Sequence, residues 1–251
     1  MNPPSSMYAL ITGATGGIGR ALVDEFTKSG YQVIATDIVK QPDDLKCAFY
    51  IQANLAKTVE NEEYANQIFS SIQTHLENQT LSVLINNAAI QILGSVEKLS
   101  RLDWQKTLNT NLVAPFIWTQ AFLDDLEKSK GNVINISSIH AHLSKKNFVA
   151  YATSKAALSS LTRNMAIDLG NKVRINAIEP AAIETDMLKA GFEGKEELYQ
   201  QLKHFHPQNQ IGQPEEVAKL ALSLASSDIP FLHGTVIKLD GGISGCLHDP
   251  D

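Results

Sequence analysis

The stretch TGATGGIG, residues 12–19, directly follows a short apolar run, MYALIT at 7–12, and opens a helical pattern. Glycine allows a tight turn between a strand and a helix, and it lets the backbone approach a bound pyrophosphate. The N-terminus of the following helix then stabilises the negative charge. Many strand-to-helix turns contain glycine, so the turn alone is weak support. Its position between a strand and a helix favours a dinucleotide-binding α/β fold.

Short apolar runs alternate with longer helical patterns along the rest of the chain. Most runs are apolar at nearly every residue, as expected for parallel strands covered on both faces. The predicted strands are 7–12, 31–36, 47–52, 81–86, 132–137, 173–178 and 234–239. The predicted helices are 17–29, 59–77, 100–128, 150–169 and 214–226. This alternation predicts an α/β fold with a doubly wound (Rossmann-like), mainly parallel seven-stranded sheet and helices on both faces.

No internal repeat, low-complexity tract or linker divides the chain, so residues 1–251 are interpreted as a single domain. One segment, 184–213, inserts helical, polar and glycine-containing sequence between a strand and the last helix. We expect it over the carboxyl ends of the strands, where ligands bind in such sheets, and predict that it is a lid. The alternative is a surface excursion with no role in binding.

The composition is that of a globular protein, with 43% hydrophobic and 19% charged residues. A net charge of −6 without a basic run argues against nucleic acid as the main partner. Two distant cysteines, Cys47 and Cys246, indicate neither a disulfide framework nor a metal knuckle. The sequence has no secretory-type start and no apolar run that could span a bilayer, so we expect a cytoplasmic protein without a membrane partner.

Asp37 ends the second predicted strand, 18 residues beyond Gly19. A carboxylate at this place can accept hydrogen bonds from both hydroxyls of an adenosine ribose, and it repels a 2′-phosphate. Neither Thr15 in the turn nor Ile38 after Asp37 is basic, which also favours NAD over NADP. The alternative is that Asp37 is a solvated acid at a strand end.

Further motifs follow in order along the chain. They are NNAA (86–89) after the fourth strand, Asn111 in LNTNLVAPF, Ser138 in INISS, the pair Tyr151 and Lys155 in YATSK, EPAAIET (179–185) and LDGG (239–242). With the glycine turn, which has the form T-G-x-x-x-G-x-G, this set resembles the compact, single-domain branch of the short-chain dehydrogenase/reductase family. The resemblance runs from about Tyr8 to Gly242, and the order and spacing of the motifs make it specific.

The resemblance implies four catalytic residues: Asn111, Ser138, Tyr151 and Lys155. Tyr151 would be the general acid and base of an NAD(P)-dependent interconversion of a secondary alcohol and a ketone, with NAD preferred. A phenol has an ordinary pKa of about 10, so we expect the Lys155 ammonium one helical turn away to lower it. By resemblance, Lys155 also binds the nicotinamide ribose, Ser138 holds the substrate oxygen, and Asn111 continues a water-linked proton relay. Each residue also has an ordinary explanation; Asn111, for example, could pin a strand by side-chain hydrogen bonds.

The resemblance also implies a set of cofactor-binding residues. They are Thr12, Gly13, Thr15, Gly16, Gly17, Ile18, Gly19, Asp37, Asn54, Leu55, Asn87, Ala88, Ala89, Tyr151, Lys155, Pro180, Ala181, Ile183 and Thr185. Three of them depart from the common family pattern. Asn54 replaces an aspartate near the adenine, and Ala89 and Ala181 replace glycines close to the cofactor. We expect these changes to weaken cofactor binding modestly; a catalytically weak, NAD-sensing or regulatory protein of the same fold is the alternative function.

The substrate site is expected along the loops that follow the strands, with Ser138, His140, Tyr151, Gln91 and Ala182 as substrate contacts. Two histidines, His140 and His142, would make one wall polar, which favours a polyhydroxylated or carboxylated small molecule. Apolar residues of the lid would suit a ring or acyl substrate instead. No metal site is indicated, because His204 and His206 lack further ligands. The resemblance implies a homo-oligomer, a dimer or a tetramer, with the helices near 100–128 and 150–169 at one interface.

Overall fold

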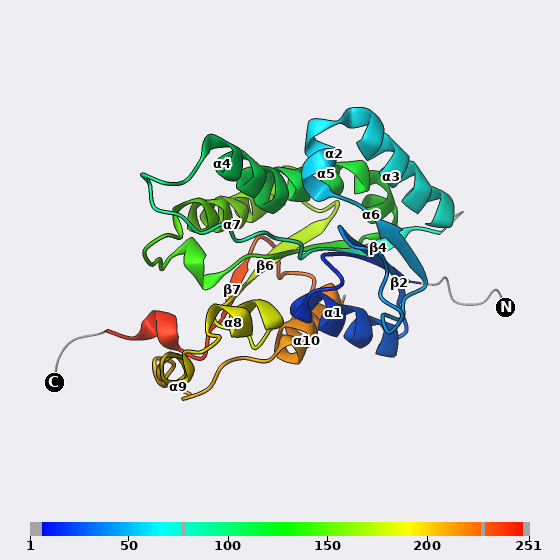
Figure 1. The fold of residues 1–251 in the computed structure, drawn as a ribbon. Helices are drawn as coiled ribbons and strands as arrows, with labels where there is room; N and C mark the ends of the chain where they lie inside the picture. The colour runs from blue at the N-terminus through cyan, green and yellow to red at the C-terminus, as the bar shows by residue number, and fades with distance from the viewer. Residues whose placement is uncertain (1–6, 77–78, 227–228, 248–251) are drawn as a thin grey trace.

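The computed structural model describes residues 7–76, 79–226 and 229–247. Seven strands form one wholly parallel sheet in the order β3-β2-β1-β4-β5-β6-β7 (Figure 1). The strands are β1 (Tyr8–Thr12), β2 (Gln32–Asp37), β3 (Phe49–Gln52), β4 (Leu81–Asn86), β5 (Asn132–Ile136), β6 (Arg174–Pro180) and β7 (Val236–Leu239). The direction of winding reverses between β1 and β4, and ligands bind at such a switch point in doubly wound sheets. The predicted fold class is confirmed.

Helices cover both faces of the sheet. On one face α1 (Gly17–Lys28) packs with α10 (Pro214–Ala225); on the other lie α3 (Glu62–Leu76), α5 (Ala114–Ala121), α6 (Leu123–Ser129) and α7 (Val149–Leu169) (Figure 1). Successive strand residues point to opposite faces. Thus Ile11 joins the α1 and α10 core, whereas Leu10 joins the other core, and both are fully buried.

Two of the predicted helices are interrupted. The segment near 100–128 contains α4 (Arg101–Leu108), a π-helical turn at Asn109–Val113, then α5 and α6. Pro115 has no N–H to donate to the carbonyl of Asn111 four residues earlier, and π turns form where the regular ladder is broken. The predicted helix at 59–77 begins earlier, as α2 (Leu55–Glu60), and breaks at Asn61, whose backbone is extended. Its last predicted residue, 77, lies outside the described residues.

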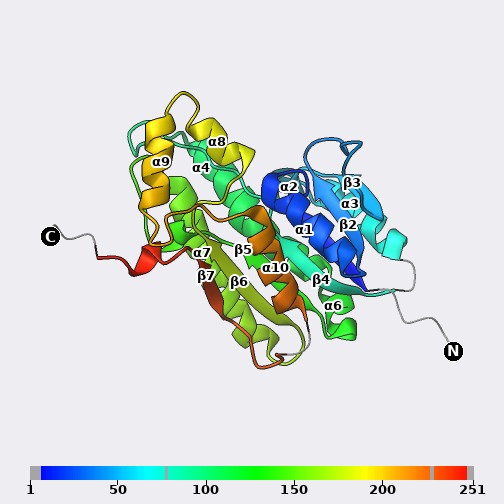
Figure 2. The same cartoon turned by 90° about the horizontal axis from the view of Figure 1, so that it is seen from below.

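The segment 184–213 forms two short helices, α8 (Asp186–Gly191) and α9 (Glu196–His204). Its two ends are joined by backbone hydrogen bonds, from Glu184 N to Gly212 O at 2.8 Å and from Gly212 N to Ala182 O at 3.0 Å. The C-terminal end of α9 lies beside the chain that follows β7 (Figure 2), where His206 packs against Gly241. None of the helices in the described part of the chain is long and apolar enough to cross a membrane.

Candidate active site

The glycine turn is fastened to the end of β4. Asn87 Nδ2 donates to Thr12 O and Gly13 O, both at 3.0 Å, and Thr12 Oγ1 accepts from the backbone N–H groups of Asn87 and Ala88. Gly13 has φ +65°, and a Cβ there would lie 2.7 Å from Ala88 Cα. The position therefore needs glycine both for its backbone conformation and for space.

Two further glycines of the turn leave no room for a side chain. A Cβ on Gly19 would lie 2.0 Å from Gly13 O, within the turn itself. A Cβ on Gly17 would lie 2.8 Å from Thr185 Cγ2, so the loop that follows β6 sits directly on the glycine turn. Gly16 is the N-cap of α1, with Gly17 and Ile18 in its first turn. The open N-terminus of a 12-residue helix thus lies in a cradle of bare backbone.

Asp37 lies beside this turn at the end of β2. Its Oδ2 accepts hydrogen bonds from Thr15 N at 2.9 Å and Thr15 Oγ1 at 2.8 Å, and its Oδ1 accepts from Ile38 N at 2.7 Å. Arg20 is the nearby arginine. Its Nε donates to Thr15 O at 3.0 Å and its Nη1 pairs with Asp44 at 2.8 Å, so the guanidinium is directed at Asp44.

The three departures from the family pattern have clear local surroundings. Asn54 caps α2, where its Oδ1 accepts from Lys57 N at 3.2 Å, and Leu55 behind it is buried. The expected contact of this amide oxygen with adenine would thus have to share the oxygen with the helix cap. Ala89 and Ala181 are not among the described non-glycine residues with positive φ, so neither position needs glycine for its backbone. Pro180 and Ile183 flank this second alanine and are buried.

The predicted reaction centre is brought together by α7 and the turn after β5. Tyr151 and Lys155 lie one helical turn apart on α7, with the Lys155 Nζ 5.8 Å from the centre of the Tyr151 ring. Ser138 follows β5 and is buried, and its hydroxyl hydrogen-bonds to the Tyr151 side chain. The Lys155 side chain is 2% exposed and its Nζ donates to Ile136 O at 2.7 Å.

The pKa shifts of Tyr151 and Lys155 differ from the expectation. Burial raises the pKa of Tyr151, and the hydrogen bond from Ser138 opposes the rise. Burial also lowers the pKa of Lys155 from 10.5 to about 7. The prediction that Lys155 lowers the pKa of Tyr151 is wrong for the protein by itself, because desolvation removes much of the ammonium charge that was to act.

Asn111 lies in the π turn and is fully buried. Its Oδ1 accepts from Ile90 N at 2.9 Å, and its Nδ2 donates to Ile90 O at 2.9 Å and to Ser154 Oγ at 3.0 Å. Ser154 in turn donates to Tyr151 O at 2.7 Å. The side chain therefore pins the loop after β4 to α7. Sequence reasoning missed Ser154, although its place between the tyrosine and the lysine of YATSK was available as a signal.

Only some of the predicted substrate-binding residues contact one another in the structure. The His140 ring packs on Phe148 at 4.5 Å and edge-on against Tyr151 at 5.9 Å between ring centres. Its Nδ1 lies 3.0 Å from Leu143 O, and burial lowers its pKa. Within the described residues, no hydrogen bond or ion pair joins Gln91 or Ala182 to Tyr151.

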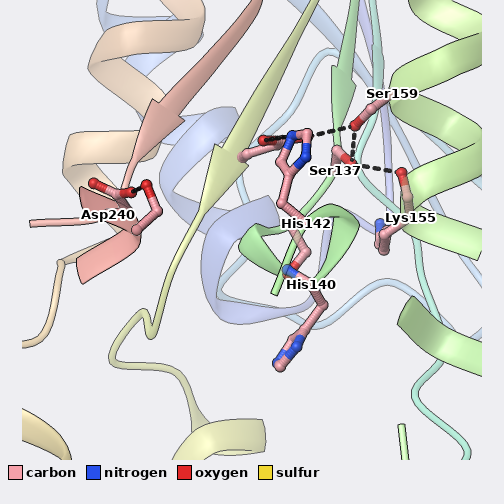
Figure 3. Close-up of polar contacts among 9 residues, drawn as sticks. Ser137, His140, His142, Lys155, Ser159 and Asp240 are labelled. Carbon is pink, nitrogen blue, oxygen red and sulfur yellow. Dashed lines mark hydrogen bonds and ion pairs between the residues drawn. The ribbon is translucent and has the colours of Figure 1, made fainter. Parts of the chain in front are cut away.

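The second histidine of this turn has a partner that sequence reasoning missed. His142 Nε2 lies 3.1 Å from Oε2 of Glu179, a fully buried carboxylate in β6 (Figure 3). A carboxylate within a buried strand is rare and was the available signal. Among the described residues, no group of three or more histidine, cysteine, aspartate or glutamate side chains could hold a metal ion.

Comparison with known proteins gives consistent matches. Residues 13–244 match the family model described as enoyl-(acyl carrier protein) reductase. A 3-oxoacyl-[acyl-carrier-protein] reductase of Aquifex aeolicus is 32% identical over 94% of this chain and 96% of its own length. The ligand-free aldohexose dehydrogenase of Thermoplasma acidophilum superposes with a TM-score of 0.91 at 30% identity, covering 98% of this chain and 97% of that one.

Two other solved structures carry cofactors. A 4-hydroxyisoleucine dehydrogenase complexed with NADH has a TM-score of 0.85 at 29% identity, covering 96% of this chain and all of that one. A putative NAD(P)-dependent gluconate 5-dehydrogenase from Beutenbergia cavernae with bound NADP has a TM-score of 0.86 at 26% identity, covering 96% and 98%. The chain therefore belongs to the short-chain dehydrogenase/reductase family, and its relatives support an oxidoreductase that acts on an alcohol or a ketone.

Proposed function

We propose that this protein is an NAD(H)-dependent oxidoreductase that interconverts a secondary alcohol and a ketone, with Tyr151 as the general acid and base. The observation that carries the proposal is the meeting of the Ser138 hydroxyl, the Tyr151 phenol and the buried Lys155 amine at the end of β5. A hydroxyl donor beside a phenol can hold a carbonyl oxygen while that oxygen gains a proton.

The cradle formed by Gly13, Gly17 and Gly19 fits the pyrophosphate of a dinucleotide. At each of these positions a Cβ would meet neighbouring atoms at 2.8 Å or less, so the bare backbone at the N-terminus of α1 is what a ligand phosphate would approach. With a dinucleotide bound at this cradle, its nicotinamide ring would supply or accept the hydride of the reaction. Asp37 would hold the adenosine ribose, and Lys155 the nicotinamide ribose.

NAD is favoured over NADP by the charges at the end of β2. A 2′-phosphate would lie close to the Asp37 carboxylate, and the two negative charges would repel each other. Arg20 could otherwise have offset this charge, but its guanidinium is paired with Asp44. Because the family includes a neighbour with bound NADP as well as one with NADH, the preference comes from these residues and not from the family.

Tyr151 would donate its proton to the ketone oxygen in reduction and remove one from the alcohol in oxidation. Burial raises its pKa, so the neutral phenol needed for reduction predominates throughout the neutral range. Asn111 would contribute a relay from the buried amine: its two N–H groups are used, but Oδ1 accepts one bond and retains a second lone pair.

For the substrate we propose a small molecule with further hydroxyl or carboxyl groups. His140 lies beside Tyr151, and an aldohexose and a 4-hydroxy amino acid are named for two structural neighbours. The apolar residues of 184–213, such as Met187, which is 62% exposed, suit contact with the carbon skeleton of the ligand. We propose that this segment closes over the substrate as a lid.

A catalytically weak, NAD-sensing protein is the second candidate. One observation favours this second function: in the protein alone, burial raises the pKa of Tyr151 and Lys155 does not lower it. We also keep as proposals a cytoplasmic location and a homo-oligomer. Phe116 on α5 and Ile167 on α7 are exposed apolar residues that would suit a subunit interface, and light scattering measures the assembly.

The test is a binding titration of NADH and NADPH by fluorescence, followed by turnover of a panel: aldohexoses, gluconate, 4-hydroxyisoleucine and a 3-oxoacyl thioester. Asp37→Ala should reduce the preference for NADH by about tenfold, since the like-charge repulsion is worth on the order of 1 kcal/mol or more. Asp24→Ala, on the exposed side of α1, is the matched control. Tighter binding of NADPH than NADH by the unaltered protein would contradict the cofactor assignment, and NADH binding without turnover of any compound would favour the sensing function.

A further inference from the structure

Glu179 is a carboxylate without solvent contact beneath the proposed reaction centre. It lies in β6 next to Pro180, and its exposed fraction is 0%. A buried carboxylate is costly unless its oxygens find donors or a positive partner. Oε1 accepts a hydrogen bond from Ser159 Oγ at 2.7 Å. Oε2 accepts no hydrogen bond of good geometry from the described residues. It forms an ion-pair contact with His142 Nε2 at 3.1 Å.

The polar chain continues from Glu179 into α7. Ser159 Oγ lies 2.7 Å from Ser137 Oγ, and Ser137 Oγ lies 3.0 Å from the Lys155 backbone oxygen (Figure 3). Ser159 has one proton, which it donates to Glu179, so Ser137 shares its own proton between Ser159 and the Lys155 carbonyl. The chain ends at a backbone carbonyl and not at Nζ. It therefore cannot carry protons to the amine, and its effect is on position.

At its other end the network reaches the turn that carries Ser138. Ser138 opens this short turn, where its Oγ accepts from His140 N at 3.1 Å. His142 closes the turn by donating its N–H to Ile139 O at 3.0 Å. The His142 side chain is 49% exposed. Within the described residues, its polar contact with a buried group is the one with Glu179. Glu179 thus holds the far end of the turn, four residues from Ser138.

We propose that Glu179 is a positioning residue for the oxidoreductase reaction, acting through His142 on Ser138 and through Ser159 and Ser137 on the turn of α7 that carries Lys155. The inference rests on the proposed function, because its effect is the spacing between the Ser138 hydroxyl and the Tyr151 phenol. Misplacement of a reacting group by about 1 Å costs on the order of a hundredfold in rate.

Glu179→Gln is the direct test, because glutamine keeps the shape and the acceptor for Ser159 but turns a neutral amide toward His142. We expect kcat on the best compound of the panel to fall about tenfold to a hundredfold, with NADH affinity and the thermal midpoint essentially kept. His142→Ala should lower kcat similarly. His142→Gln should recover most of the loss, because the glutamine amide can place an N–H near the position of the imidazole Nε2–H.

Glu127→Gln on α6 removes an exposed ion pair with Lys172, and this matched control should leave kcat unchanged. A substrate-free measurement separates this inference from the proposed function: the ¹⁵N signals of the His142 ring should shift in Glu179→Gln but not in Glu127→Gln. Unshifted His142 signals would overturn the proposal whether or not a substrate is known. So would wild-type kcat in Glu179→Gln, or an equal fall in NADH affinity and thermal midpoint, which would indicate a general structural role.

Discussion

The burial of Lys155 makes a prediction that needs neither cofactor nor substrate. Lys155 is 2% exposed, and burial lowers its pKa from 10.5 to about 7. Each pKa unit corresponds to about 1.4 kcal/mol, so the charged amine destabilises the folded protein by about 5 kcal/mol at low pH. Between these two pKa values the unfolded chain holds more protons than the folded one, and stability rises with pH.

Lys155→Met removes this titration. For the stated pKa values, the free energy of unfolding of the wild type should rise by about 3 kcal/mol relative to the variant between pH 6 and pH 9. Loss of the hydrogen bond to Ile136 O also changes stability, but that contribution does not depend on pH. The pH-dependent part therefore isolates the buried charge.

The assay is urea unfolding of both proteins at fixed concentration, at half-unit steps from pH 6 to pH 9. Lys28→Met, on the exposed end of α1, measures what a surface lysine contributes. Curves for the wild type and Lys155→Met that stay parallel over this range would refute the reasoning, because they would mean that the amine keeps its ordinary hydration in the folded protein.

Two further predictions concern the proton and the glycine turn. With Tyr151 as base and its pKa raised by burial, kcat/KM for alcohol oxidation should rise about tenfold per pH unit from pH 7 to pH 9, whereas ketone reduction should lack this rise; a flat oxidation profile would contradict the assignment. Gly13→Ala should lower the free energy of unfolding by about 3 kcal/mol, from positive φ and from the close approach to Ala88. Gly30→Ala, with φ +89° but open space around it, should cost only about 1 kcal/mol in the same urea assay; equal losses would show that space at Gly13 does not matter.

The sheet could be predicted from the sequence because parallel strands buried on both faces are apolar at nearly every residue. All seven strands lie within two residues of their predicted bounds. The interruption near Asn111 could not be predicted from apolar periodicity, because the residues buried at the π turn, Asn109, Thr110 and Asn111, are polar. Pro115 marked the place, but a proline in the first turn of a helix is also compatible with an ordinary start.

The reaction centre was predicted as a set of residues, and its energetics were not. The spacing of Tyr151 and Lys155 predicts one helix face, which the structure has. The direction of their pKa shifts depends on how much solvent the sheet and its loops exclude, and local spacing does not contain that quantity. Glu179 was missed for a related reason, since its partners lie 20 and 37 residues away in the chain and meet it only in the fold.

Tyr151→Phe tests the central claim most directly, because it removes one oxygen atom and leaves the ring in its contacts with His140 and Phe148. Steady-state turnover of the best panel compound is measured beside NADH affinity by fluorescence. The proposed function predicts that kcat falls by about a thousandfold or more, on the scale of acid–base catalysis, while NADH binds as to the wild type. Turnover within about tenfold of the wild type, with NADH bound normally, would contradict it.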